Sequence, residues 1–179
     1  MRVRSYLTPI LVIAYGTGRR ISSILKLRPE DLLPDHGPFG ALRWRADADK
    51  MGVESVVPIS SEVRAAIDRQ LAERHDQESP WLFPSPGDPA KPVRRELARK
   101  WLREAERMAG LKKLKGGLWH PYRRQWATAR KHLPDVDVAA AGGWKTIRTL
   151  VDIYQQPDDD SMLRVVLEGG TVRSVAGSD

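Results

Sequence analysis

One stretch of the chain, "ALRWRADADKMGVESVVPIS" at 41–60, has the pattern of a β-hairpin. Leu42 and Trp44 alternate with arginines, and a Val-rich second strand is expected from Val53 to Ile59. Pro58 cannot donate a hydrogen bond to a neighbouring strand, so this strand should lie at a sheet edge. The other segments show helical periodicity or turn residues. The sequence therefore predicts an α+β protein, mainly α-helical with a small antiparallel sheet or hairpin.

Helical periodicity marks several segments. Buried or amphipathic helices are expected at 6–16, 60–74 and 93–110, and three short helices between Trp119 and Tyr154 should be separated by Pro134 and by Gly142-Gly143. The side chains of 93–110 that should face the core are Val93, Leu97, Trp101, Ala105 and Met108. The segments 28–40 and 80–92 are rich in Pro and Gly, which predicts turns and a loop.

Composition narrows the function classes. The 179 residues are 41% hydrophobic, which is enough for one domain with a core. The formal charge of +7 suits a polyanionic partner, with nucleic acid the first candidate and a membrane surface the second. A merely solvated, Arg-rich surface is the alternative. The absence of cysteine excludes thiol catalysis, thiolate metal sites and disulfides, and four histidines without HExxH spacing argue against zinc. The longest apolar run, Ile10 to Tyr15, is too short to span a bilayer, which suggests a soluble, intracellular protein.

A tyrosine ends an apolar stripe near the C-terminus. The residues at i, i+3, i+4 and i+7 of this stripe are Ile147, Leu150, Val151 and Tyr154, which a helix would place on one face. Taken alone, a packed core tyrosine is the favoured interpretation. The alternative is a nucleophile held at a helix end, which needs activation because the free pKa of tyrosine is about 10.

Three further motifs supply cations. In "HPYR", Pro121 can start a helix that directs His120 and Arg123 toward one point. Arg20 follows the glycine-broken turn "GTGR", and Lys50 lies in the expected hairpin turn. Converging arginines suit phosphate because the guanidinium presents a planar fork of donors. Each motif also has a plain alternative, namely a capping histidine, surface arginines or a solvated turn lysine.

The order of these motifs carries more weight than any one of them. "TGRRISSILKL", "DKMGVESVVPIS", "HPYRRQWAT" and "AAGGWKTIRTLVDIYQQ" together resemble the tyrosine recombinases, the phage-integrase family, over roughly residues 5 to 158. The "GGW…YQQPD" ending resembles integrases of actinobacterial phages and prophages. The catalytic residues that the resemblance implies are the nucleophile Tyr154 together with Arg20, Lys50, His120, Arg123 and Trp144.

Two positions depart from the family pattern. Ser23 stands where an acidic residue usually occurs, so a buttress for Arg20 is either missing or supplied elsewhere. Arg124 stands where a histidine is frequent.

The resemblance implies an organisation. Residues 1–160 would form a catalytic domain of the tyrosine recombinase fold, and 161–179 a tail that is partly disordered or packs on a neighbouring protomer. The resemblance also implies that an N-terminal core-binding domain would be absent, which agrees with the helical pattern that follows Met1 almost at once.

The resemblance also implies an activity. The chain would perform site-specific integration or excision of DNA through a 3′-phosphotyrosine intermediate, without metal, ATP or other cofactor. Its partner would be double-stranded DNA in the cytoplasm, bound by a tetramer on paired sites, with the isolated protein a monomer. The residues expected to contact DNA are Arg19, Lys112, Lys113, Lys115, Arg124 and Lys145.

Other functions stay open at this point. A domain of this fold could bind DNA without cutting it, or could nick and close DNA in the manner of a type IB topoisomerase. A basic helical RNA-binding domain is a further alternative, but it predicts stacking aromatic residues on a sheet, and the hairpin offers only Trp44.

Overall fold

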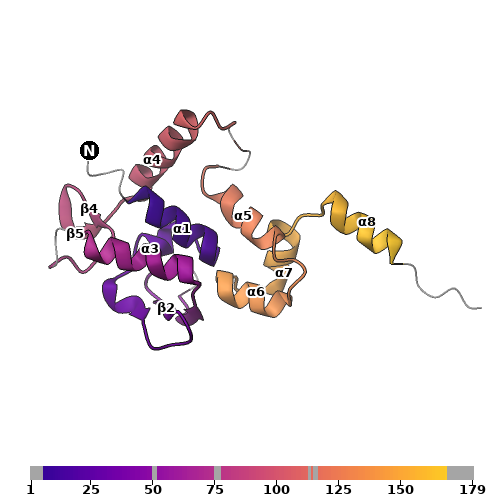
Figure 1. Ribbon diagram of the computed structural model, residues 1–179, viewed down its shortest axis with the longest axis horizontal. Coiled ribbons are helices and arrows are strands. Elements are labelled where there is room, and N and C mark those ends of the chain that lie inside the picture. The colour runs from indigo at the N-terminus through magenta and orange to yellow at the C-terminus, as the bar shows by residue number, and fades with distance from the viewer. Residues whose placement is uncertain (1–5, 50–51, 75–77, 113, 115–116, 169–179) are drawn as a thin grey trace, which may run out of the picture.

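A computed structural model describes residues 6–49, 52–74, 78–112, 114 and 117–168 (Figure 1). The architecture is mainly helical with antiparallel strands, as the sequence predicted, but it has two small sheets where one was expected. The elements in chain order are α1 (Leu7–Thr17), α2 (Ile21–Ile24), η2 (Pro29–Asp31), β1 (Leu32–Leu33), β2 (Ala41–Trp44), β3 (Ser55–Pro58), α3 (Ser61–Ala72), β4 (Pro84–Ser85), β5 (Asp88–Pro92), α4 (Arg95–Met108), α5 (His120–Thr128), α6 (Asp135–Gly142), α7 (Ile147–Thr149), η3 (Leu150–Tyr154) and α8 (Asp159–Leu167).

The predicted hairpin supplies two strands of a three-stranded sheet. Its strand order is β1-β2-β3, with Leu42 opposite both Leu32 and Val57. Pro58 pairs with Ala41 on the edge strand β3, which confirms the position inferred from its missing N–H. Strand β1 and the β4–β5 hairpin arise in the two segments that were expected to be only turns and loop. Two-residue strands such as β1 and β4 are too short to show periodicity, so no residue pattern predicts them.

The main core surrounds α1. Ile10 and Ile13 of this helix are fully buried, and α1 packs against α3, α4 and α5 (Figure 1). Its Gly16 allows this proximity, because a side chain there would overlap Val63 of α3. Trp44 and Phe83 extend the same core beneath the two sheets. The N-terminal half therefore has one continuous core, which supports the turn that follows α1.

A second core joins α5, α6 and η3. Its largest members are Trp126, Trp144, Leu150 and Tyr154. The two cores meet where the Trp126 indole donates a hydrogen bond of 3.3 Å to the carbonyl oxygen of Gly16. This contact fixes the C-terminal helices against the end of α1.

The expected faces of two helices are partly wrong. Met108 is 62% exposed, so the buried stripe of α4 is shorter than predicted, whereas Val93 is buried as predicted although it precedes the helix. Ile147 and Val151 are also exposed, whereas Leu150 and Tyr154 are buried. The reason for the second error is that η3 is a π-helix, in which the N–H of Gln155 bonds to the carbonyl of Leu150 at 3.0 Å. The wider turn of a π-helix places Leu150 and Tyr154, four residues apart, on the buried face, and it leaves the other two residues of the predicted stripe exposed.

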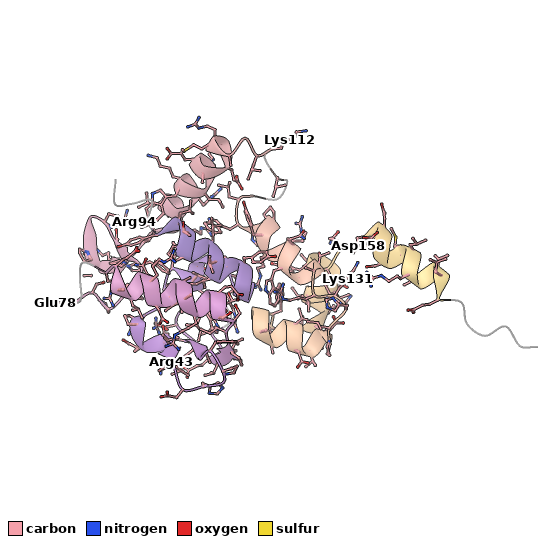
Figure 2. The ribbon with its side chains drawn as sticks, viewed as in Figure 1. Arg43, Glu78, Arg94, Lys112, Lys131 and Asp158 are labelled. Atoms are coloured by element: carbon pink, nitrogen blue, oxygen red, sulfur yellow. The ribbon has the colours of Figure 1, made fainter. Side chains whose placement is uncertain are left out.

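Helix α8 projects away from the rest of the molecule (Figure 1). Asp158 caps it by accepting a hydrogen bond of 2.8 Å from the N–H of Ser161, and the same carboxylate pairs with Lys131 (Figure 2). Its apolar side chains, Met162, Leu163, Val165, Val166 and Leu167, are exposed. The tail predicted to be disordered begins in α8, and its remainder, 169–179, lies outside the described residues. Among the helices described, none combines the length and the apolar character needed to cross a membrane.

Candidate active site

The turn after α1 sets the geometry of the site. Gly18 ends the helix in the left-handed region at φ 63°, and its N–H bonds to the carbonyl of Ala14 at 3.0 Å. A side chain at Gly18 would overlap the indole of Trp126, so both the backbone angle and the space require glycine. Two neighbouring arginines follow this turn and have different environments.

Arg19 is buried, with only 4% of its surface exposed. Its Nε and Nη2 donate to the carbonyls of Ala141 and Ala140 at 2.8 and 3.1 Å, and Nη2 also donates to the Ser55 hydroxyl at 2.9 Å. Its guanidinium lies 4.9 Å from the ring centre of Trp44. Burial lowers the pKa of Arg19 to about 10. Arg19 was predicted to contact DNA; it lines the cavity described below, and its donors bond to groups of the protein itself.

Arg20 reaches the rim of the site instead. It immediately precedes α2, and its side chain is 22% exposed. Nη1 donates to the carbonyl of Gly143 at 3.3 Å and lies 3.8 Å from Oδ1 of Asp49. The Gly143 backbone is also left-handed, at φ 70°, and a side chain there would overlap the Arg19 guanidinium. Gly143 therefore lets Arg19 approach the end of α6, while Gly142 leaves space for the ring of Trp144.

Arg123 is the most deeply placed cation of α5. Its Nη1 donates to the carbonyls of Gly18 and of Gly142, the latter at 2.6 Å. Its Cζ lies 3.6 Å from the ring centre of Trp144. Nε and Nη2 are buried and have no hydrogen bond of acceptable geometry within the described residues. Burial and the charge of Arg20 lower the pKa of Arg123 to about 9, an effect that the nearby side chain of Tyr154 opposes.

His120 begins α5, as its position before Pro121 predicted. It is exposed, and its ring centre lies 6.3 Å from that of Tyr154. Partial burial and the charges of Arg123 and Arg20 lower the pKa of His120 below its usual value. His120 is therefore mainly neutral at neutral pH, a state in which one ring nitrogen can accept a proton.

Tyr154 and Trp144 pack against each other beside Arg123. Their rings meet edge to face at 5.0 Å, and Trp144 stacks on Trp126 at 5.9 Å. The indole N–H of Trp144 is buried and finds no acceptor within the described residues. Tyr154 is 8% exposed, and its carbonyl accepts a hydrogen bond of 3.1 Å from the Thr128 hydroxyl. The tyrosine that ends the apolar stripe is thus both packed and directly beside the cations.

A small cavity of about 80 Å³ opens among these cations. Arg20, His120 and Arg123 line it together with Arg95, which begins α4. The charge of Arg95 helps to lower the pKa of His120, so the two side chains sense each other electrostatically. Tyr154 is not among the lining residues; it lies behind His120 and Trp144. The cavity is suited to an anion, because it is lined by His120 and by the four arginines Arg19, Arg20, Arg95 and Arg123.

Comparison with known proteins shows which family the chain belongs to. The family model described as "Phage integrase family" matches residues 2–161, nearly the whole chain. The chain belongs to the phage integrase family. The match does not distinguish lineages within the family, so it does not bear on the actinobacterial origin suggested by the ending. A comparison with curated protein sequences gave no match.

Solved structures resemble this integrase-family chain in fold. The XerA recombinase matches with a TM-score of 0.72 and 19% identity, over 92% of this chain and 56% of its own. The XerH site-specific recombinase, in a post-cleavage complex with a palindromic difH substrate, matches with a TM-score of 0.75 and 20% identity, over 92% and 46%. The Tn1549 transposon integrase, in complex with a circular intermediate DNA, matches with a TM-score of 0.62 and 17% identity, over 89% and 57%. The chain spans about half the length of these structures.

The integrase-family fold brings five of the six predicted catalytic residues together. Arg20, His120, Arg123, Trp144 and Tyr154 come from four separate segments and meet at the junction of the two cores. The sixth, Lys50, lies outside the described residues. Within the part of the chain that the structure describes, no cluster of His, Cys, Asp or Glu could hold a metal ion.

The predicted DNA-contacting residues have mixed positions. Lys145 and Lys112 are exposed, Lys112 beyond the end of α4 (Figure 2), and Arg124 is half-buried on α5. Lys113 and Lys115 lie outside the described residues.

Sequence reasoning missed three residues of the site. Arg95 lines the cavity, Asp49 contacts both Arg19 and Arg20, and Trp126 supports Trp144 from behind. Trp126 was visible in "HPYRRQW" at three residues from Arg123, a spacing that places both on one side of a helix. Arg95 and Asp49 carry no local signal, because only the folded chain brings α4 and the hairpin turn to α5.

Proposed function

We propose that this chain is the catalytic domain of a tyrosine recombinase, which cleaves and rejoins double-stranded DNA through a 3′-phosphotyrosine intermediate. The observation that carries the proposal is the convergence of Arg20, Arg123 and His120 on one small cavity, with the ring of Tyr154 beside them. A cluster of cations that lower one another's pKa is costly without an anion, and a phosphate would relieve this repulsion.

The donors fit the charge that develops during phosphoryl transfer. The guanidinium of Arg20 would bind one non-bridging oxygen from the rim, and Arg123 would offer its buried Nε and Nη2 to another. The indole of Trp144 can only donate a hydrogen bond, and its N–H has no acceptor within the described part of the chain. These groups would stabilise the phosphorane-like transition state without taking or giving a proton.

Each bond and proton has a place in the proposed reaction. The hydroxyl oxygen of Tyr154 attacks the scissile phosphorus and forms a phosphotyrosine bond, while the bond to the 5′-oxygen breaks. The tyrosine proton passes to a base, for which neutral His120 is a candidate at a ring separation of 6.3 Å. Lys50 is the candidate acid that protonates the leaving 5′-oxygen. Attack by a 5′-hydroxyl of the partner strand reverses these steps and releases Tyr154.

The proposed partners are double-stranded DNA and further copies of the chain. The similar structures of XerH and the Tn1549 integrase contain DNA, which supports double-stranded DNA as the partner here. The exposed apolar side chains of α8 favour docking of this helix on a neighbouring protomer within a tetramer on paired sites. The isolated chain would be a monomer and would act in the cytoplasm on host or phage DNA.

A specific observation favours a second candidate. Tyr154 is mostly buried and does not line the cavity, as would suit a domain of this fold that binds DNA without cutting it. A nicking and closing enzyme of the type IB topoisomerase kind would use the same residues. It differs from a recombinase in acting without paired sites.

A covalent trapping experiment tests the proposal. Nicked duplexes with a randomised core are incubated with wild type and with Tyr154→Phe, without metal or ATP. The nick lets the short cleaved product diffuse away, so covalent adducts accumulate and their DNA can be sequenced. We expect wild type, but not Tyr154→Phe, to trap a defined sequence. DNA binding by wild type without any adduct would instead support the non-cutting candidate.

A recombinase and a topoisomerase are then separated with the trapped sequence. Two labelled duplexes that carry it are mixed with the protein. Exchange of strands between the duplexes supports a recombinase, whereas relaxation of supercoils without exchange supports the topoisomerase alternative.

A further inference from the structure

A single carboxylate lies between the two arginines of the turn. The side chain of Asp49 is 5% exposed and stands in the turn after β2. Its Oδ2 is 3.3 Å from Nη1 of Arg19, and its Oδ1 is 3.8 Å from Nη1 of Arg20. The two oxygens thus face different arginines.

Arg19 fixes the position of this carboxylate. The remaining donors of Arg19 bind the carbonyls of Ala140 and Ala141 and the hydroxyl of Ser55, so its guanidinium is anchored to α6 and to β3. An anchored guanidinium at 3.3 Å holds Asp49 in place. The turn that leads directly into Lys50 is thereby attached to the end of α6.

Arg20 depends more strongly on Asp49 than Arg19 does. Its other contact in the described structure is the Gly143 carbonyl at 3.3 Å, and its side chain is partly exposed. Ser23, at the position where the family usually has an acid, is 2% exposed and meets Arg20 through the backbone, its N–H bonding to the Arg20 carbonyl at 2.9 Å. A serine hydroxyl has no charge with which to orient a guanidinium.

We propose that Asp49 is the positioning residue for Arg20 and supplies, from the hairpin turn, the carboxylate that position 23 lacks. The inference rests on the proposed function, in which Arg20 binds a non-bridging oxygen of the scissile phosphate. Asp49 does not touch that phosphate; it directs Arg20 toward it.

Asp49→Asn keeps the size of the side chain and removes its charge. On the duplex trapped as above, we expect the rate of adduct formation to fall about tenfold to a hundredfold, because a small displacement of a catalytic group costs that much. DNA affinity should change less than twofold, since Arg20 is one of several phosphate contacts. The matched control is Asp47→Asn, on the same turn but exposed and paired with Arg45 at 3.2 Å, and its rate should equal that of wild type.

A double-mutant cycle distinguishes positioning from a general effect on folding. In an Arg20→Ala background, Asp49→Asn should cause no further loss of rate, because its effect passes through Arg20. Asp49→Glu, which keeps the charge, should recover most of the rate lost in Asp49→Asn. An equal loss from Asp49→Asn with and without Arg20, or a wild-type rate in Asp49→Asn, would overturn the inference.

A measurement without DNA keeps this test separate from the proposed function. Arginine Nε–Hε resonances report side-chain order by NMR in the protein alone. In Asp49→Asn we expect the Arg20 signal to become mobile, while Arg19 stays ordered through its carbonyl contacts. An unchanged Arg20 signal contradicts the positioning role whatever the reaction is. Absence of an adduct from wild type contradicts only the proposed function.

Discussion

The guanidinium of Arg123 lies over the indole of Trp144, with 3.6 Å between Cζ and the ring centre. Both side chains are buried, and both retain N–H groups without a hydrogen-bond partner in the described residues. Buried donors without acceptors destabilise a protein, and a phosphate bound at the proposed site would supply acceptors for these two.

Anion binding should stabilise the folded protein through Arg123. Because a ligand that binds only the folded state raises stability by mass action, inorganic phosphate should raise the melting temperature more than chloride does at equal ionic strength. Arg123→Met should abolish this difference. Arg148→Met is the control, since the Arg148 side chain is 90% exposed and pairs with Asp152 on the same helical segment. Equal stabilisation of wild type and Arg123→Met by phosphate would contradict the assigned anion site.

Stability should depend on pH through His120. Its pKa is lowered on folding by burial and by Arg123, so the folded state binds fewer protons than the unfolded state between the lowered pKa and about 6.5. Wild type should therefore lose free energy of unfolding as pH falls through that window, and His120→Asn should lose less. Urea denaturation at several pH values measures this difference, with His36→Asn as the control for removing an exposed histidine elsewhere. A difference between wild type and His120→Asn that is constant with pH would exclude the effect.

Arg95 should affect both the pKa of His120 and the salt dependence of DNA binding. Arg95→Ala removes one of the cations that lower the pKa of His120, so an NMR titration should show that pKa rise. The neighbouring Arg94→Ala is the matched control, because Arg94 is exposed beside Arg95 but does not line the cavity (Figure 2). Loss of one phosphate contact should also reduce the salt dependence of DNA binding, by about 1 in the slope of log K against log salt. The assignment fails if both variants shift His120 equally.

Gly18→Ala should destabilise the protein more than Gly110→Ala. Both glycines are left-handed, at φ 63° and 67°, which costs an alanine about 1–2 kcal/mol. Space around Gly110 is open, whereas a methyl group at Gly18 would overlap Trp126 and add about 1–3 kcal/mol of overpacking. Chemical denaturation of the two variants gives the comparison. Equal losses would mean that the ring of Trp126 moves aside without cost.

The sequence determined the local parts of this protein. Helical periodicity located α1, α3 and α5, strand alternation located β2 and β3, and Pro58 marked the sheet edge. These predictions succeed because each depends on neighbours along the chain. The motifs around Arg20, His120, Arg123 and Tyr154 were recognisable for the same reason, and the family match is consistent with them.

Only the tertiary structure decided how those parts combine. Arg19 and Arg20 are identical neighbours in sequence, yet the left-handed turn at Gly18 directs one into the core and the other to the rim. Asp49 and Arg95 gain their roles from contacts with segments distant in the chain. The orientation of Tyr154 follows from the π-turn of η3, whose wider spacing a helical pattern does not reveal. Long-range packing sets side-chain burial and hence pKa, and no local pattern of residues encodes it.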